Sequence, residues 1–168
     1  PENPERVTMS LDDSMEAQPT VVFACRPCDA RGFAVLDRPY LQGPFADPYY
    51  KARREALTVV TLTCPSGCNT CFCHWVGGGP SSPEGSDVLM TGVEGGYVLQ
   101  AVTPRGEELL AASSLPDGAE QFPLAEAARK AAWATLEPAP DIKGAPEKLA
   151  ALFTDAEFWQ NWTDRCLS

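Results

Sequence analysis

Four cysteines stand within ten residues of this chain, and they are Cys64, Cys68, Cys71 and Cys73. Two more, Cys25 and Cys28, lie nearer the N-terminus and are separated by two residues. A packed core seldom needs thiols at this density, whereas soft-metal ligation, redox chemistry and disulfides require them. A chain of 168 residues can bury enough core to fold without disulfides, and no secretory signal is visible. Metal ligation or redox chemistry is therefore the favoured explanation.

Charge and hydropathy argue against two broad classes of protein. The formal net charge of −10 disfavours binding to nucleic acid, which needs a basic surface. No run of about 18 apolar residues is present, so we expect no membrane span. The chain begins at Pro1 rather than Met, and we expect it to be a piece of a longer polypeptide.

The first half of the chain predicts an α/β unit. An apolar strand is expected over residues 20–25, followed by a helix that begins at Cys28 and stops at Pro39. A second helix is expected over residues 47–57, with Asp47 as its N-cap, and a second buried strand over residues 58–63. This order favours neighbouring parallel strands. Each strand then carries a cysteine to its carboxyl end, the edge where ligand sites of open α/β sheets lie.

The second half predicts a hairpin and several helices. Gly95 and Gly96 separate two expected strands, residues 87–93 and 97–103. Helices are expected over residues 107–114, 121–137 and 146–153, and after a capping box at Thr154–Glu157. The fold class is thus α/β, with a small mixed sheet, flanking helices and a cysteine-rich loop at the carboxyl edge of the strands.

Cysteine spacing leaves the kind of metal site open. An iron–sulfur cluster takes about four thiolates, but the spacing from Cys64 to Cys73 is not that of a standard ferredoxin. Zinc could take cysteines of the same stretch together with His74, or two knuckles formed by Cys25-x2-Cys28 and Cys68-x2-Cys71. A thiol enzyme using Cys25 and Cys28 is a third hypothesis, but Cys25 is expected inside a strand.

Several separate motifs resemble one family, in order, over roughly residues 20–168. They are Arg26-Pro-Cys28-Asp29, Asp47-Pro-Tyr-Tyr-Lys-Ala-Arg-Arg-Glu55, Cys64 with Thr70-Cys71-Phe-Cys73, Gly78-Gly79-Pro80, Gly96-Tyr97-Val98 and Gly106-Glu-Glu-Leu-Leu110. The chain resembles the beta subunit of cytoplasmic group 3 nickel–iron hydrogenases of the sulfhydrogenase type. That family also includes the A subunit of anaerobic sulfite reductase.

The resemblance implies an electron-transfer iron–sulfur subunit of a cytoplasmic oxidoreductase complex, with no substrate chemistry on this chain itself. Its partners would be a flavin subunit that handles NAD(P) and a nickel–iron hydrogenase or a sulfur- or sulfite-reducing subunit. The family pattern covers Cys28, Cys64, Cys71 and Cys73, which are the implied ligands of one 4Fe–4S cluster. Cys68, an addition in this sequence as Cys25 is, is the alternate ligand. A structural zinc-binding scaffold module remains the alternative function.

The resemblance also suggests how the chain is divided. Residues 1–19 would be a polar linker or extension, and residues 20–118 the α/β cysteine-rich cluster-binding domain. Residues 119–168 would be a helical segment that leads into a ferredoxin module. Cys166 would then be the first ligand of a cluster in that module.

The predicted strands suggest how the four ligands meet. Cys28 and Cys64 follow two strands at one sheet edge, so they are expected to face each other. Cys71 and Cys73 alternate around Phe72, so an extended segment would place both thiols on one side and Phe72 in the core.

Overall fold

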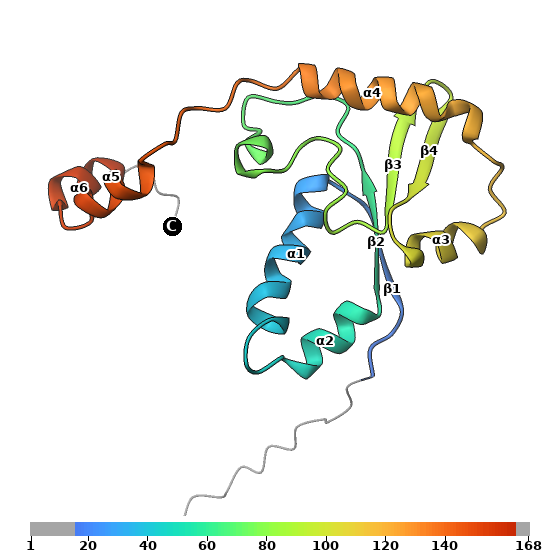
Figure 1. Ribbon diagram of the computed structural model, residues 1–168, viewed down its shortest axis with the longest axis horizontal. Coiled ribbons are helices and arrows are strands. Elements are labelled where there is room, and N and C mark those ends of the chain that lie inside the picture. Colours follow the sequence, from blue (N-terminus) through green and yellow to red (C-terminus); the bar gives the residue numbers. More distant parts are fainter. Residues whose placement is uncertain (1–15, 164–168) are drawn as a thin grey trace, which may run out of the picture. The chain divides into compact units, whose positions relative to one another are not determined.

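The computed structural model describes residues 16–163, which fall into two compact units that divide between Glu137 and Pro138 (Figure 1). The first unit contains, in chain order, β1 (Thr20–Cys25), α1 (Pro27–Leu41), α2 (Pro48–Glu55), β2 (Leu57–Leu62), η1 (Cys73–Val76), β3 (Val88–Val93), β4 (Gly96–Ala101), α3 (Pro104–Ala111), η2 (Ala119–Gln121) and α4 (Phe122–Ala134). The second unit contains α5 (Ala145–Leu152) and α6 (Ala156–Thr163). None of the described helices is long and apolar enough to span a membrane.

The four strands form one mixed sheet in the order β1-β2-β3-β4. β1 pairs with β2 and β2 with β3 in parallel, whereas β3 and β4 form the antiparallel hairpin expected around Gly95 and Gly96. Figure 1 shows α1 and α2 on one side of the sheet and α3 on the other. α1 packs against β2, α4 against β3 and α3 against β4. The predicted fold class is confirmed.

The core lies on both faces of the two central strands. On the face that α3 covers, Val60, Val88 and Met90 form a buried cluster, and partly buried leucines complete it: Leu62, Leu99, Leu109 and Leu110. Val59 and Leu89 alternate with that set and are buried on the opposite face. Burial on both faces fits the composition of β2, in which Leu and Val predominate and Thr61 is buried with them.

Asp87 joins the start of β3 to three other elements. Its carboxylate accepts hydrogen bonds from the Val59 N–H at 2.8 Å and from the Thr103 hydroxyl at 2.6 Å. Its carbonyl oxygen accepts the N–H of Val102 at 2.8 Å. Thr103 is the N-cap of α3. Asp87 therefore connects β2, the end of β4 and the first turn of α3.

Several predicted element bounds agree with the structure. β1 has the expected bounds, and Asp47 caps α2 by accepting the Tyr50 N–H at 2.8 Å. α3 begins three residues earlier than expected, at Pro104, because Thr103 caps it and Pro104 suits the first helical position. In the second unit Asp155, not Thr154, caps α6, since its carboxylate accepts the Phe158 N–H at 3.0 Å.

Two expectations about the first strand and helix are wrong. α1 does not stop at Pro39 but runs to Leu41, with Pro39 inside its last turn, where the helix lacks one backbone hydrogen bond. β1 is not buried: Val21 is 50% exposed and Phe23 is 66% exposed. β1 is an edge strand of the sheet, so one of its two faces lacks the helix cover that β2 has.

We expect Gly85→Ala to lower the free energy of unfolding by about 2–5 kcal/mol, as measured by urea denaturation followed by circular dichroism. Gly85 has a φ of +82°, and a Cβ there would lie 2.0 Å from the carbonyl oxygen of Ala30 in α1. The left-handed conformation costs about 1–2 kcal/mol and overpacking about 1–3 kcal/mol.

Gly118→Ala is the matched control, because a Cβ at Gly118 meets nothing within 4 Å. It should change the unfolding free energy by no more than about 0.5 kcal/mol. Equal losses of unfolding free energy from the two substitutions would contradict the close packing of Gly85 against Ala30 of α1.

Candidate metal centre

The parallel pairing of β1 and β2 delivers two cysteines to one edge of the sheet. β1 ends at Cys25, and Cys28 follows in the first turn of α1. β2 ends at Leu62, two residues before Cys64. Beyond the strand, the Cys64 N–H donates to the carbonyl oxygen of Pro80 at 2.8 Å. The loop that carries the other cysteines therefore returns to the same edge.

The thiols of Cys28, Cys64, Cys71 and Cys73 lie close enough for their charges to interact. Cys64 feels the charges of Cys28, Cys71 and Cys73, and the charge of Cys73 also acts on Cys28 and Cys71. Burial raises the pKa of Cys64, the neighbouring Cys28 raises it further, and Arg26 opposes both effects. Cys64 therefore lies within electrostatic range of thiols from two other segments of the chain.

Cys28 lies in the first turn of α1, where a helix dipole would stabilise a thiolate. Its pKa is nevertheless raised, first by partial burial and then by the negative charge of Asp29. The same Asp29 accepts the Arg26 N–H at 3.1 Å and closes the capping box of the helix. The carboxylate that stabilises the helix start therefore opposes ionisation of the cysteine beside it.

Cys68 and Cys71 are in direct contact through a tight turn. The Cys71 N–H donates to the Cys68 carbonyl oxygen at 3.0 Å, and the two sulfur atoms are 3.1 Å apart. The hydroxyl of Thr70, 3.2 Å from the Cys68 sulfur, and then the Cys71 thiol lower the pKa of Cys68 to about 7. The pKa of Cys71 is raised, chiefly by this hydrogen bond with Cys68. The pair therefore retains one proton on Cys71 when Cys68 ionises.

Cys25 is separate from this group. Its sulfur lies 3.9 Å from the carbonyl oxygen of Val60 and 3.6 Å from the hydroxyl of Thr61, both on β2. An irregularity in the β1–β2 register, with Ala24 at a φ of +61°, pairs Cys25 with Thr61. Cys25 is thus a half-buried thiol held against the sheet.

The expected extended conformation around Phe72 is wrong. Cys73 opens the short 3-10 helix η1, and Phe72, which precedes it, is 58% exposed rather than part of the core. The turn from Cys68 to Cys71 leads directly into this helix. Cys71 and Cys73 therefore reach the other thiols through two tight turns and not by the alternation of a strand.

Sequence reasoning missed Arg31, which lies one helical turn after Cys28 in α1. Its Nη1 donates to the carbonyl oxygen of Val76, at the end of η1, and its Nε pairs with Glu84 at 2.6 Å. Arg31 therefore fastens the segment that begins at Cys73 to the helix that carries Cys28. Its spacing from Cys28 was the one available signal, since residues three apart share a helix face.

The C-terminal end of α4 also holds the cysteine loop. The Thr135 hydroxyl accepts the Gly67 N–H at 2.7 Å, and the His74 Nε2 donates to the carbonyl oxygen of Glu137 at 2.7 Å. Trp133 packs so closely on Gly79 that a Cβ there would lie 2.1 Å from the indole ring. These contacts join residues more than 50 positions apart, so no local sequence pattern predicts them.

His74, the candidate zinc ligand, has one ring nitrogen without a hydrogen-bond partner among residues 16–163. A carbonyl only accepts, so Nε2 carries the proton and Nδ1 has a lone pair. Nδ1 is buried and has no hydrogen-bond partner among residues 16–163. However, no three His, Cys, Asp or Glu side chains of that range lie close enough to hold a single metal ion.

A single zinc ion and an iron–sulfur cluster require different spacings of their sulfur ligands. Zinc–sulfur bonds of about 2.3 Å in a tetrahedral site bring the sulfur ligands within about 4 Å of one another. A 4Fe–4S cluster binds each thiolate through a different iron, so its ligands stand farther apart. Cys28 is exposed and Cys64, Cys71 and Cys73 are half-buried, and among residues 16–163 no three His, Cys, Asp or Glu side chains close into one tight group.

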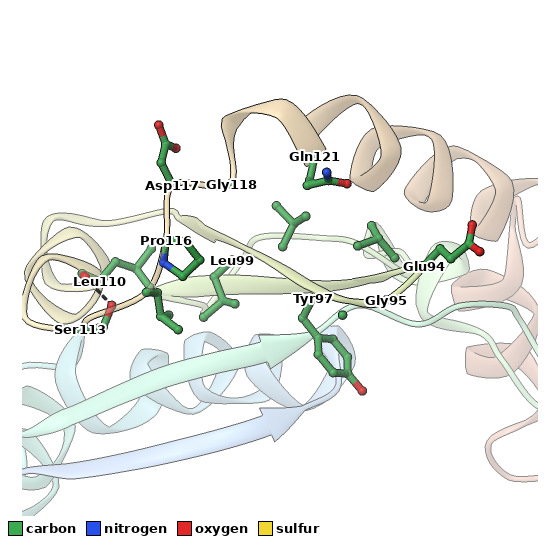
Figure 2. Close-up of a pocket in the computed structure, with 14 residues that line it drawn as sticks. Glu94, Gly95, Tyr97, Leu99, Leu110, Ser113, Pro116, Asp117, Gly118 and Gln121 are labelled. Carbon is green, nitrogen blue, oxygen red and sulfur yellow. Dashed lines mark hydrogen bonds between the residues drawn. The ribbon is translucent and has the colours of Figure 1, made fainter.

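A cavity among the described residues lies away from the cysteines. Figure 2 shows a space of about 530 Å³ between β4, the end of α3 and the segment that follows it, with Tyr97, Leu99 and Leu110 in its wall. No cysteine or histidine lines it. The thiols therefore lie outside this cavity.

Comparison with known proteins gives one relationship. No protein-family model matches the chain, and no solved structure matches it. Over 90 residues it is 30% identical to sulfhydrogenase 2 subunit beta of Pyrococcus furiosus. The match covers 54% of this chain and 26% of that protein, so the chain spans about a quarter of the length of the relative. A hydrogenase beta-subunit-like relationship therefore holds over about half of the chain.

We expect Cys68 to be the first thiol alkylated when the iron-free chain meets iodoacetamide near pH 7. With its pKa lowered to about 7, roughly half of Cys68 is thiolate there, whereas Cys28, Cys64 and Cys71 have pKa values raised above 9. After allowance for the weaker nucleophilicity of a less basic thiolate, the advantage should be roughly fivefold. Peptide mass spectrometry across about pH 6–9 gives each rate.

Thr70→Val tests the cause, because it keeps the shape of the side chain and removes the hydroxyl. The half-maximal pH for Cys68 should then rise toward 9, while Thr70→Ser should leave it near 7. A wild-type Cys68 that titrates near 9 would contradict the turn geometry.

Proposed function

We propose that this chain is an electron-transfer iron–sulfur subunit of a multisubunit oxidoreductase. It would relay electrons between an NAD(P)-linked flavin subunit and a hydrogenase or a sulfur- or sulfite-reducing subunit. The observation that carries the proposal is the parallel pairing of β1 and β2, which leads to Cys28 and Cys64 at one edge of the sheet, where Cys64 is within electrostatic range of Cys28, Cys71 and Cys73. The partial similarity to a sulfhydrogenase beta subunit supports it.

The proposed ligands are Cys28, Cys64, Cys71 and Cys73. One 4Fe–4S cluster bound there would supply one-electron transfer. The chain's own contribution is to hold Cys28 and Cys64, whose pKa values are raised by partial burial and then by nearby negative charge, until a cation compensates that charge. Arg26 supplies part of that compensation at Cys64. Arg31 and the end of α4 fix the loop, so the thiols are positioned before any metal binds.

The proposal extends to the rest of the polypeptide. Residues 20–118 would form the cluster-binding domain, residues 1–19 a linker, and residues 119–168 a helical segment leading into a ferredoxin-type module. Cys166, proposed as the first ligand of that module, lies outside the described residues. The similarity and the acidic charge support a cytoplasmic complex, in which partner subunits would cover part of the surface.

Replacing each proposed ligand by alanine should remove iron and acid-labile sulfide from the anaerobically purified chain. Cys28→Ala, Cys64→Ala, Cys71→Ala and Cys73→Ala should each lose most of about four iron atoms per chain, with their visible absorption and paramagnetic resonance signal. Folding should also weaken, because binding of the group and folding are coupled. Iron and sulfide analysis with electron paramagnetic resonance measures the effect.

Cys25→Ala is the matched control, because Cys25 is held by β2 outside the thiol group, and it should keep full iron content. Cys68→Ala should also keep it. If Cys68→Ala loses the signal and Cys73→Ala retains it, the ligand set is wrong, although a cluster remains. A colourless protein with one zinc per chain would instead establish the scaffold alternative.

A further inference from the structure

The turn that contains Cys68 and Cys71 has the geometry of a disulfide site. Its closing hydrogen bond, 3.0 Å from the Cys71 N–H to the Cys68 carbonyl, brings the two Cα atoms within about 7 Å. Disulfides span Cα separations of about 4.4–6.8 Å. The sulfur atoms already stand 3.1 Å apart, and the Cys68 N–H donates to the Cys71 sulfur at 3.1 Å. A small side-chain rotation would bring the sulfurs to bonding distance.

Exposure distinguishes this pair from the other thiols. Cys68 is exposed to solvent, so a small oxidant reaches it directly, and Cys71 is half-buried behind it. Cys25 faces backbone and hydroxyl groups of β2 instead of another sulfur. The chain therefore offers an accessible thiol with a second thiol in contact, the arrangement of an attacked and a resolving cysteine.

We propose that Cys68 and Cys71 form a reversible disulfide when a hydroperoxide oxidises the chain without its metal. The Cys68 sulfur attacks the O–O bond of the peroxide, so that an S–O bond forms, the O–O bond breaks, and water or an alcohol leaves with the thiol proton. The Cys71 sulfur then attacks the Cys68 sulfur; the S–S bond forms, the S–O bond breaks, and the hydroxyl leaves as water with the second proton. Two thiols are oxidised, and one peroxide is reduced.

The consequence for metal loading rests on the function proposed above. Cys71 is one of the four proposed ligands, so a disulfide withdraws it and blocks assembly of the site. Cys68, which lies outside the ligand set, gives this chain a means to protect Cys71 from irreversible oxidation. Exposed disulfides of this kind are readily reduced by dithiols, so the block is reversible.

The test uses the full chain freed of iron, with hydrogen peroxide as the oxidant and iodoacetamide as the thiol label. Cleavage by chymotrypsin after Phe72 separates Cys73 from the pair. Fragmentation of the resulting peptide should show Cys64 labelled, and Cys68 and Cys71 unlabelled and lighter by two hydrogens. Dithiothreitol should restore labelling of both. Peroxide-treated chain should take up at least fivefold less iron and sulfide than the same chain after reduction.

Cys68→Ser should abolish the disulfide and leave Cys71 able to react with the label, whereas Cys25→Ser should leave the disulfide intact. Full labelling of Cys68 and Cys71 after peroxide treatment would refute the proposed Cys68–Cys71 disulfide. A disulfide from either of them to another cysteine would also refute it. A disulfide that leaves iron uptake unchanged would overturn its role in loading. If the reduced chain binds no iron or sulfide, the proposed function fails, while the peptide map still decides whether the pair exists.

Discussion

Parallel pairing of β1 with β2 is the constraint on which the candidate site depends. It places the carboxyl ends of both strands at one edge, so Cys28 and Cys64 approach although 36 positions separate them. Antiparallel pairing would have placed the two cysteines at opposite edges. The pairing is itself stabilised by burial of β2 on both faces and by the polar contacts of Asp87 at the start of β3.

Long-range contacts hold the cysteine loop against this edge. The loop has little regular structure, and its local hydrogen bonds close only short turns around Cys68 and η1. Arg31 fastens one side to α1, and the end of α4 fastens the other through Thr135 and Glu137. A loop so fixed offers its thiols in a defined arrangement, which lowers the entropy lost when a ligand binds.

Charge explains why such an arrangement suits a metal. Thiols brought within electrostatic reach of one another resist ionisation, and partial burial of Cys28 and Cys64 adds to that resistance. A positively charged group among the thiols favours their thiolate forms, which then bind it. Cys68 is the exception, since its hydrogen bonds favour the thiolate at the solvent-exposed side of the loop. Cys68 therefore differs from Cys28, Cys64 and Cys71, whose pKa values are raised.

Apolar runs and capping residues by themselves determined β1, β2, the hairpin and α2, because strand runs, turn glycines and a capping Asp47 act over a few residues. The ends of the predicted strands likewise placed Cys28 and Cys64 at one edge of the sheet, whereas the choice of ligands among the cysteines stays a prediction. Only the tertiary structure decided that β1 is exposed, that Phe72 points outward and that Cys73 starts a helical turn. It alone revealed Arg31 and α4 as supports of the loop, because contacts between distant residues depend on how the elements pack and leave no periodic mark in the sequence.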